Sequence, residues 1–189
     1  MPGKITKKGE GLSEMTLRPV GIVRSKIKEP SLVVKSGDLD WRAALEDAKK
    51  ERITISKIMI SDDLAGILDG IEEFSHILVL YWSHFASQAD RSLTKAHPMG
   101  RKGLPRVGIF ATCSPVRPNP ICVSAVQLLE RKGNVLKVRG LDAVDGSPVV
   151  DIKPYVPSYY AVSEARISSW VRQIEDEISR VFKGNEQRQ

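Results

Sequence analysis

The sequence predicts an all-β protein built on a closed β-barrel, with short helical insertions and a C-terminal amphipathic helix. Many short segments with strand composition are separated by close turns, which is typical of barrels and sandwiches. One long segment near the C-terminus has helical periodicity instead. The 189 residues, with 41% hydrophobic and 28% charged side chains, are enough for one soluble domain with a sizeable core.

Alternating or continuous apolar patterns mark the strands, which we expect at 17–25, 52–60, 76–82, 107–111, 121–130, 135–141 and 149–152. The segment RITISKIMI alternates with a period of two and predicts a half-buried strand. The segment HILVLYW is apolar throughout, so we expect a central strand that is buried on both faces. Gly133 and Asn134 form the turn between two strands.

The remaining segments connect or extend the barrel. Residues 1–16 carry lysines and little to bury, so they are expected to be a flexible basic tail, either plainly disordered or in contact with RNA phosphates. Residues 26–40 are expected to form a loop and 41–51 a short amphipathic helix. Ser61 with its two following acids predicts a cap for a helical turn at 64–68. The barrel domain therefore covers 17–160, and 161–189 form the C-terminal helix and tail.

The C-terminal helix is expected at 163–182, with Ser163 as its N-cap and Gly184 just beyond its end. One face gathers the apolar side chains of Ile167, Trp170, Val171, Ile174, Ile178 and Val181. This face either covers a mouth of the barrel or packs against a second subunit.

The charge balance favours an acidic partner. Lys and Arg outnumber Asp and Glu by 29 to 23, which gives a net charge of +6 and makes nucleic acid the first candidate. No apolar run approaches the roughly 20 residues that span a membrane, and the first residues do not resemble a signal peptide. We therefore expect a cytoplasmic protein without a membrane partner.

Two rigid loops predict a binding site. The first, 114–120, has three prolines in seven positions and presents Arg117 and Asn119 with little conformational freedom left to lose. The second, 142–148, pairs two carboxylates with a turn-forming glycine and proline. Arg117 suits a carboxylate or phosphate of a ligand, but it could equally form a structural ion pair with Asp142 or Asp151.

The other reactive residue types give weaker signals. Cys113 and Cys122 flank the proline loop and are expected to be small buried side chains, with a disulfide or a reactive thiol as the alternatives. The three histidines lack ligand spacing, so no metal site is expected. The chain also lacks a P-loop and a glycine-rich dinucleotide-binding turn.

The stretch FATCSPVRPNPICVSAVQLL, followed by LDAVDGSPVVDIKPY, resembles the TsaA-like family, whose characterised members are the TrmO tRNA methyltransferases. The resemblance spans about 17–160. It implies a β-barrel that uses S-adenosylmethionine to methylate N6 of threonylcarbamoyladenosine beside the tRNA anticodon. It also implies a homodimer whose cofactor pocket draws on both subunits. The alternative is a non-catalytic barrel that binds S-adenosylmethionine or RNA, because Lys28-Glu29-Pro30 stands where characterised members have Pro-Arg-Gln, and Cys113 where they have Arg.

The resemblance and the two loops together give the candidate site. The expected cofactor-binding residues are Ser83, His84, Cys113, Arg117, Asn119, Val123, Ala143, Val144, Asp145 and Gly146. N6 of the modified base is conjugated to a carbonyl and is a poor nucleophile, so either a group must remove its proton or the site must stabilise the developing anion. The candidates for a general base are His84 and Asp145. The basic residues of the polar segment 86–105, which are Arg91, Lys95, Arg101 and Lys102, are expected to contact tRNA, unless the segment is only a solvated loop.

Overall fold

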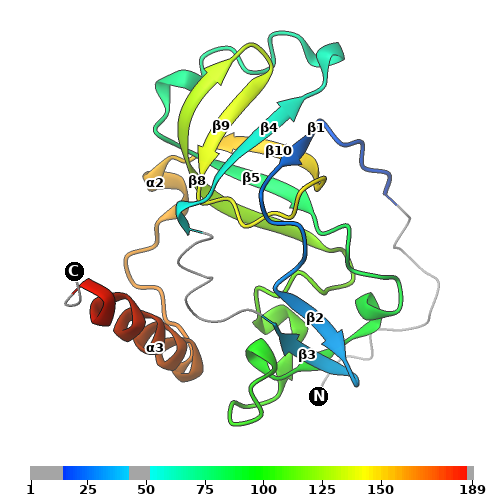
Figure 1. The fold of residues 1–189 in the computed structure, drawn as a ribbon, viewed down its shortest axis with the longest axis vertical. Helices are drawn as coiled ribbons and strands as arrows, with labels where there is room; N and C mark the ends of the chain where they lie inside the picture. Colours follow the sequence, from blue (N-terminus) through cyan, green and yellow to red (C-terminus); the bar gives the residue numbers. More distant parts are fainter. Residues whose placement is uncertain (1–14, 43–51, 187–189) are drawn as a thin grey trace, which may run out of the picture.

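The computed structural model describes residues 15–42 and 52–186 and confirms the barrel. Six antiparallel strands close on themselves (Figure 1) in the order β1 (Gly21–Arg24), β10 (Pro148–Pro154), β5 (His76–Trp82), β8 (Ile121–Lys132), β9 (Val135–Arg139) and β4 (Ile55–Ile60). Gly133 and Asn134 form the two-residue turn between β8 and β9, with Gly133 at φ 58°.

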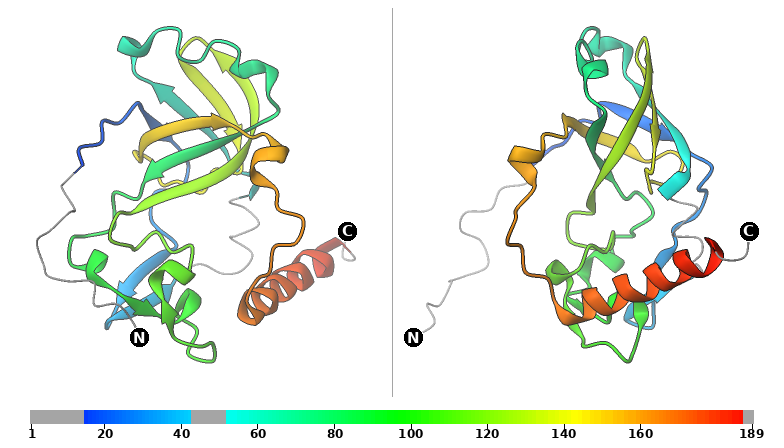
Figure 2. Two further views of the ribbon diagram at one scale, coloured as in Figure 1. Left: turned by 180° about the vertical axis from the view of Figure 1, so that it is seen from behind. Right: turned by 90° about the vertical axis from the view of Figure 1, so that its left-hand side faces the viewer.

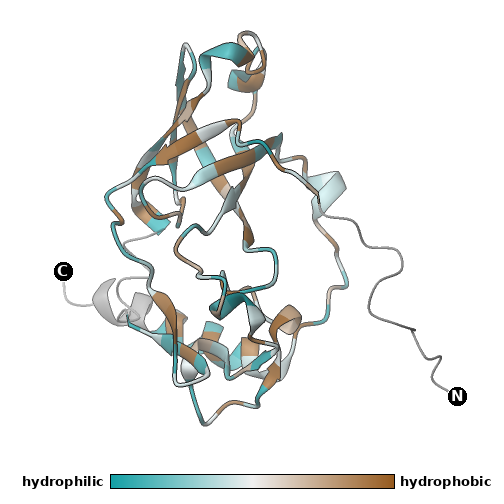
Figure 3. Cartoon of the chain, turned by 90° about the vertical axis from the view of Figure 1, so that its right-hand side faces the viewer, coloured by the Kyte–Doolittle hydropathy of each residue, from teal (hydrophilic) through white to brown (hydrophobic). Residues whose placement is uncertain are grey.

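Period-two alternation fills the barrel interior. In β4, Ser56, Ile58 and Ile60 are buried while the residues between them are exposed. Figure 3 shows the same mixture of apolar and polar segments along the strands. The expectation that β5 is buried on both faces is wrong, because Leu78 and Leu80 remain partly exposed. Only the interior of a closed barrel is filled by side chains, so an apolar strand is buried on its outer face only where another element covers it.

A second lobe, which was not expected, hangs below the barrel in Figure 1. It contains the hairpin of β2 (Leu32–Lys35) and β3 (Asp38–Trp41), the ribbon of β6 (Lys95–Ala96) and β7 (Val107–Gly108), and the 3₁₀ turns η3 (Asp90–Ser92), η4 (Pro98–Gly100) and η5 (Ile109–Ala111). Its small core is formed by Leu32, Leu39, Ala96, Ile109 and Val116. The second lobe therefore folds around its own apolar cluster.

Several boundaries differ from the expectation. The expected loop at 26–40 contains the β2–β3 hairpin, whose turn places Ser36 at φ 52° and Gly37 at φ 73°. Trp41 ends β3 rather than beginning a helix, and the rest of that expected helix, 43–51, lies outside the described residues. The expected strand at 107–111 is a strand only at 107–108 and continues as η5.

The helical segments are also shifted. The expected turn at 64–68 appears as η1 (Asp62–Leu64), followed by further turns and η2 (Ile71–Glu73); the Ser61 hydroxyl bonds the Asp63 side chain instead of capping the backbone. After the single turn α2 (Pro157–Tyr160), the last helix α3 runs over Ser169–Glu186. Ser163 is therefore not its N-cap, and Gly184 lies inside it. No helix among the described residues is both long and apolar enough to cross a membrane.

Asp38 fastens the β2–β3 hairpin to the segment that follows β6. Its carboxylate accepts hydrogen bonds from the backbone N–H of His97 at 2.8 Å and from the His97 ring at 2.6 Å, and it pairs with Lys102. Burial alone would raise the pKa of Asp38, but the bonds from Lys102 and His97 hold it well below its usual value. The side chain is 9% exposed, so this ion pair is one that the fold depends on.

Candidate functional site

A pocket of about 480 Å³ lies where the barrel, the second lobe and α3 meet. The barrel contributes Tyr81, Ser83, His84, Ile121, Cys122, Val123, Asp142, Val144 and Ser147. The second lobe and the segments that connect it to the barrel contribute Ile27, Pro30, Leu32, Leu39, Trp41, Phe85, Met99, Cys113 and Arg117. The helix α3 contributes Trp170, Val171 and Ile174. The right-hand view of Figure 2 shows α3 lying across the second lobe. The volume and this apolar lining, with a few polar groups, are typical of sites for small organic ligands.

One indole donor at the pocket has no hydrogen-bond partner among the described residues. Trp41 lines the pocket from the end of β3, and its Nε1 is the only buried side-chain nitrogen or oxygen without a hydrogen bond in the described part of the chain. A buried N–H that stays unpaired costs free energy comparable to a lost hydrogen bond. A ligand with an acceptor group would satisfy this donor.

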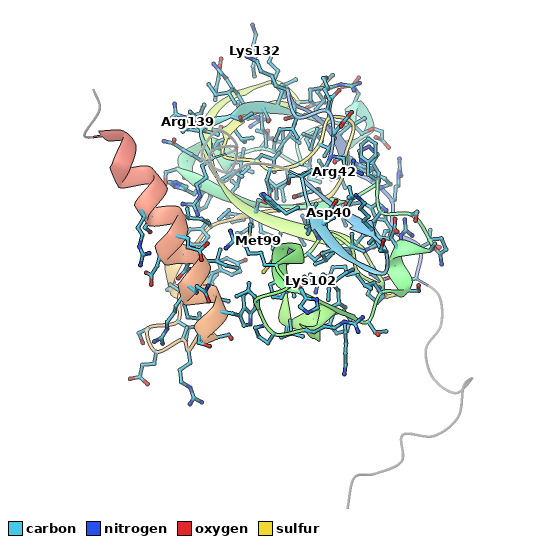
Figure 4. All side chains as sticks on the ribbon, turned by 60° about the horizontal axis from the view of Figure 1, so that its bottom comes forward. Asp40, Arg42, Met99, Lys102, Lys132 and Arg139 are labelled. Carbon is cyan, nitrogen blue, oxygen red and sulfur yellow. The ribbon has the colours of Figure 1, made fainter. Side chains whose placement is uncertain are left out.

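The backbone is strained where η4 approaches the pocket. Met99 has φ 52°, which is uncommon for a residue with a side chain, and it lines the pocket. Gly100 follows at φ 69°, and a Cβ there would lie 2.3 Å from the Leu39 carbonyl oxygen. Figure 4 shows Met99 between the β2–β3 hairpin and α3. Only glycine permits this close approach of residue 100 to the Leu39 carbonyl, and the approach keeps the neighbouring Met99 at the pocket wall.

A carboxylate and a guanidinium provide opposite charges at the pocket. Oδ1 of Asp142 accepts hydrogen bonds from the hydroxyls of Tyr81, at 2.9 Å, and Ser124. Burial, together with Asp142, raises the pKa of Tyr81, so its hydroxyl keeps its proton and remains a donor. The two hydroxyls therefore fix the position of the Asp142 side chain at the pocket, where its oxygens can accept from a cationic group.

Arg117 makes no ion pair within the described residues, so the pairing with Asp142 or Asp151 that we considered does not form; Asp151 pairs with Lys153 instead. Its guanidinium lies 5.5 Å from the centroid of the Phe110 ring, which is itself 75% exposed. Stacking on an aromatic face orients a guanidinium without using its donors. Arg117 is therefore available for an anionic group.

His84 is the titratable ring at the pocket. Its Nδ1 lies 3.3 Å from the hydroxyl of Ser147, and its Nε2 would lie 3.9 Å from a Cβ placed on Gly146. Partial burial lowers the pKa of His84 below its usual value, and the carboxylate of Asp145 opposes this shift. The imidazole is consequently neutral at pH 7 and able to accept a proton.

The other expected residues of the second loop lie behind the pocket wall. Asp145 contacts the residues that follow β1. Its Oδ1 accepts a hydrogen bond from the backbone N–H of Ser25 at 2.9 Å, and its Oδ2 forms an ion pair with Lys28 at 2.8 Å. The bonds from Lys28 and Ser25 lower the pKa of Asp145, which weakens it as a base. Ala143 is fully buried in the barrel core, and Gly146, at φ 81°, donates to the Val23 carbonyl.

The structure thus brings together six of the expected cofactor residues, which are Ser83, His84, Cys113, Arg117, Val123 and Val144. Asn119 is exposed on the proline loop and is not part of the pocket lining, and neither are Ala143, Asp145 and Gly146.

Both cysteines are free thiols. Cys113 is exposed, so it is not the buried side chain that we expected, whereas Cys122 is half-buried. Burial and the nearby Asp142 raise the pKa of Cys122 to about 11. Its thiol is protonated at neutral pH, which excludes a reactive thiolate there.

The four cations expected to contact tRNA are largely engaged within the fold. Arg101 pairs with Glu177 of α3, and Lys102 pairs with Asp38. Arg91 donates to the Ala86 carbonyl at 3.0 Å and lies 5.1 Å from the centroid of a Trp82 ring. Only Lys95, in β6, makes no side-chain ion pair or hydrogen bond with a described residue. The charged side chains of the segment 86–105 therefore mostly contact other parts of the fold.

The pocket residues that sequence reasoning missed include Trp41, Asp142, Leu39, Met99 and the three side chains from α3. The Ser36-Gly37 dipeptide between Leu32–Lys35 and Asp38–Trp41 is a hairpin signal that could have placed Trp41 on a strand. Asp142 was one of the two carboxylates noted in the second loop, and nothing in the local sequence distinguishes it from Asp145.

Comparisons with known proteins show which family the chain resembles. Residues 42–161 match the family described as the tRNA-methyltransferase O N-terminal domain. A probable S-adenosyl-L-methionine-binding protein of Methanothermobacter thermautotrophicus is 44% identical over 142 residues, which cover 75% of this chain and 90% of that protein. The tRNA (adenine(37)-N6)-methyltransferase of Escherichia coli is 34% identical over 161 residues, which cover 83% of this chain and 64% of the enzyme.

The fold is shared with a solved structure. The crystal structure of TrmO from Pseudomonas aeruginosa is similar with a TM-score of 0.58 and 28% identity, over 82% of this chain and 62% of that one. This chain therefore spans less than two thirds of the length of the Escherichia coli enzyme and of the solved structure.

Proposed function

This chain belongs to the tRNA-methyltransferase O family, and we propose that it is an S-adenosylmethionine-dependent methyltransferase that acts on tRNA. The observation that carries the proposal is the pocket between barrel, second lobe and α3, which combines an apolar lining with three polar groups suited to this cofactor. The substrate atom that we propose is N6 of threonylcarbamoyladenosine beside the anticodon.

The residues present fit the cofactor. Its adenine requires an apolar slot with a hydrogen-bond donor, which Leu39 and the unpaired Nε1 of Trp41 provide. Its amino-acid end carries an ammonium and a carboxylate, for which Asp142 and Arg117 are the matching charges. The site thus offers one partner for each polar part of the ligand.

When bound, S-adenosylmethionine supplies a methyl group activated by a positively charged sulfur. The chain has to hold the acceptor nitrogen in line with that methyl group, and positioning of this kind can contribute most of the rate enhancement. The rigid proline loop and the strained Met99 leave few groups at the pocket that need to be ordered on binding. Asp142 and Arg117 are the acidic and the basic side chain among the lining residues, so they are the groups that would fix the charged end of the cofactor.

His84 is the general base in this proposal. When its Nδ1–H donates to the Ser147 hydroxyl, Nε2 carries the lone pair and can accept the proton from the substrate N6. The lowered pKa keeps the ring neutral before transfer. Asp145, which is saturated by Ser25 and Lys28, instead fixes the loop beside the histidine. The same proposal includes a cytoplasmic location and a homodimer. Light scattering with the cofactor present would measure the oligomeric state.

Replacing Arg117 with Ala is expected to weaken cofactor binding by about ten- to a hundredfold, because a charge-assisted hydrogen bond is worth about 1.5–3 kcal/mol. The fold should survive, since the guanidinium lies over the exposed ring of Phe110 and makes no ion pair or hydrogen bond with a described residue. Titration calorimetry with S-adenosylmethionine measures the affinity. The matched control is Arg139→Ala, which removes an arginine bonded to Gln127 outside the pocket. Equal affinity of the Arg117→Ala variant and wild type for S-adenosylmethionine would mean that another group binds the cofactor carboxylate.

Loss of the gene is expected to remove one methylated nucleoside from cellular tRNA. Mass spectrometry of nucleosides from a deletion strain should show the methylated form of threonylcarbamoyladenosine disappearing while its unmethylated form accumulates. Re-expression of the wild-type chain should restore it, and re-expression of the His84→Gln variant should not. An unchanged nucleoside profile would favour the alternative, a barrel that binds the cofactor without transferring its methyl group.

A further inference from the structure

Three cations stand side by side on the outer face of the barrel. Arg24 of β1 is directly opposite Lys57 of β4, and Lys57 is directly opposite Lys137 of β9. We call these three residues the basic row. Arg24 and Lys57 are exposed and Lys137 is partly exposed. Figure 1 shows the three strands as neighbours, so the row crosses the barrel wall perpendicular to the strands.

The row is not neutralised by the fold. None of its three side chains makes an ion pair or a hydrogen bond with a described residue. The next row on the same face is apolar, with Ile22 opposite Met59 and Met59 opposite Val135. Glu130 is the one acid in register with the row, opposite Lys137 at its end, and it forms no ion pair there.

Like charges directly opposite each other in an antiparallel sheet destabilise it. The barrel needs no cation at these three outward positions, since its core is filled from the other face. The arrangement therefore favours a polyanionic partner over a structural role. Neighbouring strands are about 4.8 Å apart, so the row extends for about 10 Å. The three cations are thus close enough together to contact consecutive phosphates of one nucleic acid strand.

The row also begins beside the site. Arg24 is one residue before Ser25, whose N–H binds Asp145, and its charge contributes to the lowered pKa of that carboxyl group. Asp145 in turn follows Val144, which lines the pocket. A strand whose base enters the pocket would therefore have its backbone within reach of Arg24. By contrast, Arg101 and Lys102 of the segment between β6 and β7 are already paired with Glu177 and Asp38.

We propose that the basic row binds the phosphate backbone of the RNA whose base is methylated. This inference rests on the proposed function for its choice of polyanion, and it assigns to the row a sequence-independent contact. Phosphate contacts fix the position of an RNA while the pocket selects the base.

The test is tRNA binding as a function of salt by the triple variant Arg24→Gln, Lys57→Gln and Lys137→Gln. The affinity should fall by about 100-fold at 0.1 M salt, and the slope of log affinity against log salt should become shallower by about 2–3, because each lost phosphate contact removes about 0.7–0.9 from it. Cofactor affinity should not change. The melting temperature should stay the same or rise, since adjacent like charges are removed.

The matched control removes three exposed cations from other places: Lys35→Gln on β2, Arg166→Gln before α3 and Arg172→Gln on α3. It has the same net charge as the row variant and should bind tRNA with nearly the wild-type slope. Equal slopes for the row variant and wild type would overturn the proposal. So would a wild type that binds phosphatidylserine vesicles through the row but binds no RNA.

Failure of the row and failure of the proposed function give different results. If the row variant binds tRNA normally while the wild type transfers methyl groups, only the row is wrong. If the row carries the salt dependence but no methyl group reaches tRNA, the RNA surface stands and the methyltransferase proposal falls.

Discussion

Replacing His84 with Gln is expected to lower the rate constant of methyl transfer by about 10²–10⁴-fold, which is the usual contribution of a positioned general base. Gln is similar in length and can still hydrogen-bond Ser147, but it cannot take up a proton. Cofactor affinity should change much less than the rate. Single-turnover measurement of methyl transfer to tRNA separates the two effects.

The pH profile gives an independent reading of the same residue. Because the pKa of His84 lies below its usual value of 6.5, the wild-type rate should be constant above about pH 6.5 and fall as the ring is protonated at lower pH. The His84→Gln variant should lack this fall. The control is His76→Gln, at the exposed start of β5, whose ring lies 3.0 Å from the Ser75 hydroxyl and outside the pocket lining; this variant should behave as wild type. A His84→Gln variant with the wild-type rate and profile would assign the proton transfer to another group.

Replacing Asp38 with Asn should destabilise the protein by about 3 kcal/mol, the lower end of the range for breaking a buried ion pair, because Lys102 is 70% exposed and can be rehydrated. For a chain of this size the melting temperature should fall by about 6–12 °C. Leu39 and Trp41 follow Asp38 on β3 and line the pocket, so cofactor affinity should fall as well.

The control for Asp38 is Asp40→Asn, two residues along β3 and labelled in Figure 4. The Asp40 side chain has no ion pair or hydrogen bond with a described residue. A pH series adds a sign test. A carboxyl group with a depressed pKa stabilises the fold above its unfolded pKa of about 3.8 and loses that contribution as the pH falls further. The wild type should lose stability over this acidic range, and the Asp38→Asn variant should lose less. Equal melting temperatures for Asp38→Asn and Asp40→Asn would contradict the stabilising role of the Asp38 ion pair with Lys102.

The barrel could be predicted from sequence because local patterns determine it. Alternation in Ile55–Ile60 and the two-residue turn at Gly133 report directly on a face and a register. The second lobe could not be predicted in the same way. Its β-segments at Lys95–Ala96 and Val107–Gly108 have only two residues each, which is too short to show a period, and its core joins residues from Leu32 to Val116.

Part of the site could be predicted, because local sequence marks some of its residues while others depend on contacts that are distant in sequence. His84 and Arg117 stand in strand-end and proline contexts that can be recognised along the chain. The choice between Asp142 and Asp145 depends on contacts with Tyr81 and Lys28, which are distant in sequence. The contribution of α3 to the pocket likewise depends on where the chain between Pro154 and Ser169 carries the helix, and no local pattern encodes that path.

Transfer of a labelled methyl group to tRNA by the purified chain tests the central claim most directly. The full chain is incubated with S-adenosylmethionine carrying a deuterated methyl group and with tRNA that bears unmethylated threonylcarbamoyladenosine, and the nucleosides are then analysed by mass spectrometry. The deuterated methyl group should appear on that nucleoside with wild type and not with His84→Gln. A chain that binds the cofactor in the same samples, yet leaves the tRNA unlabelled, would contradict the account.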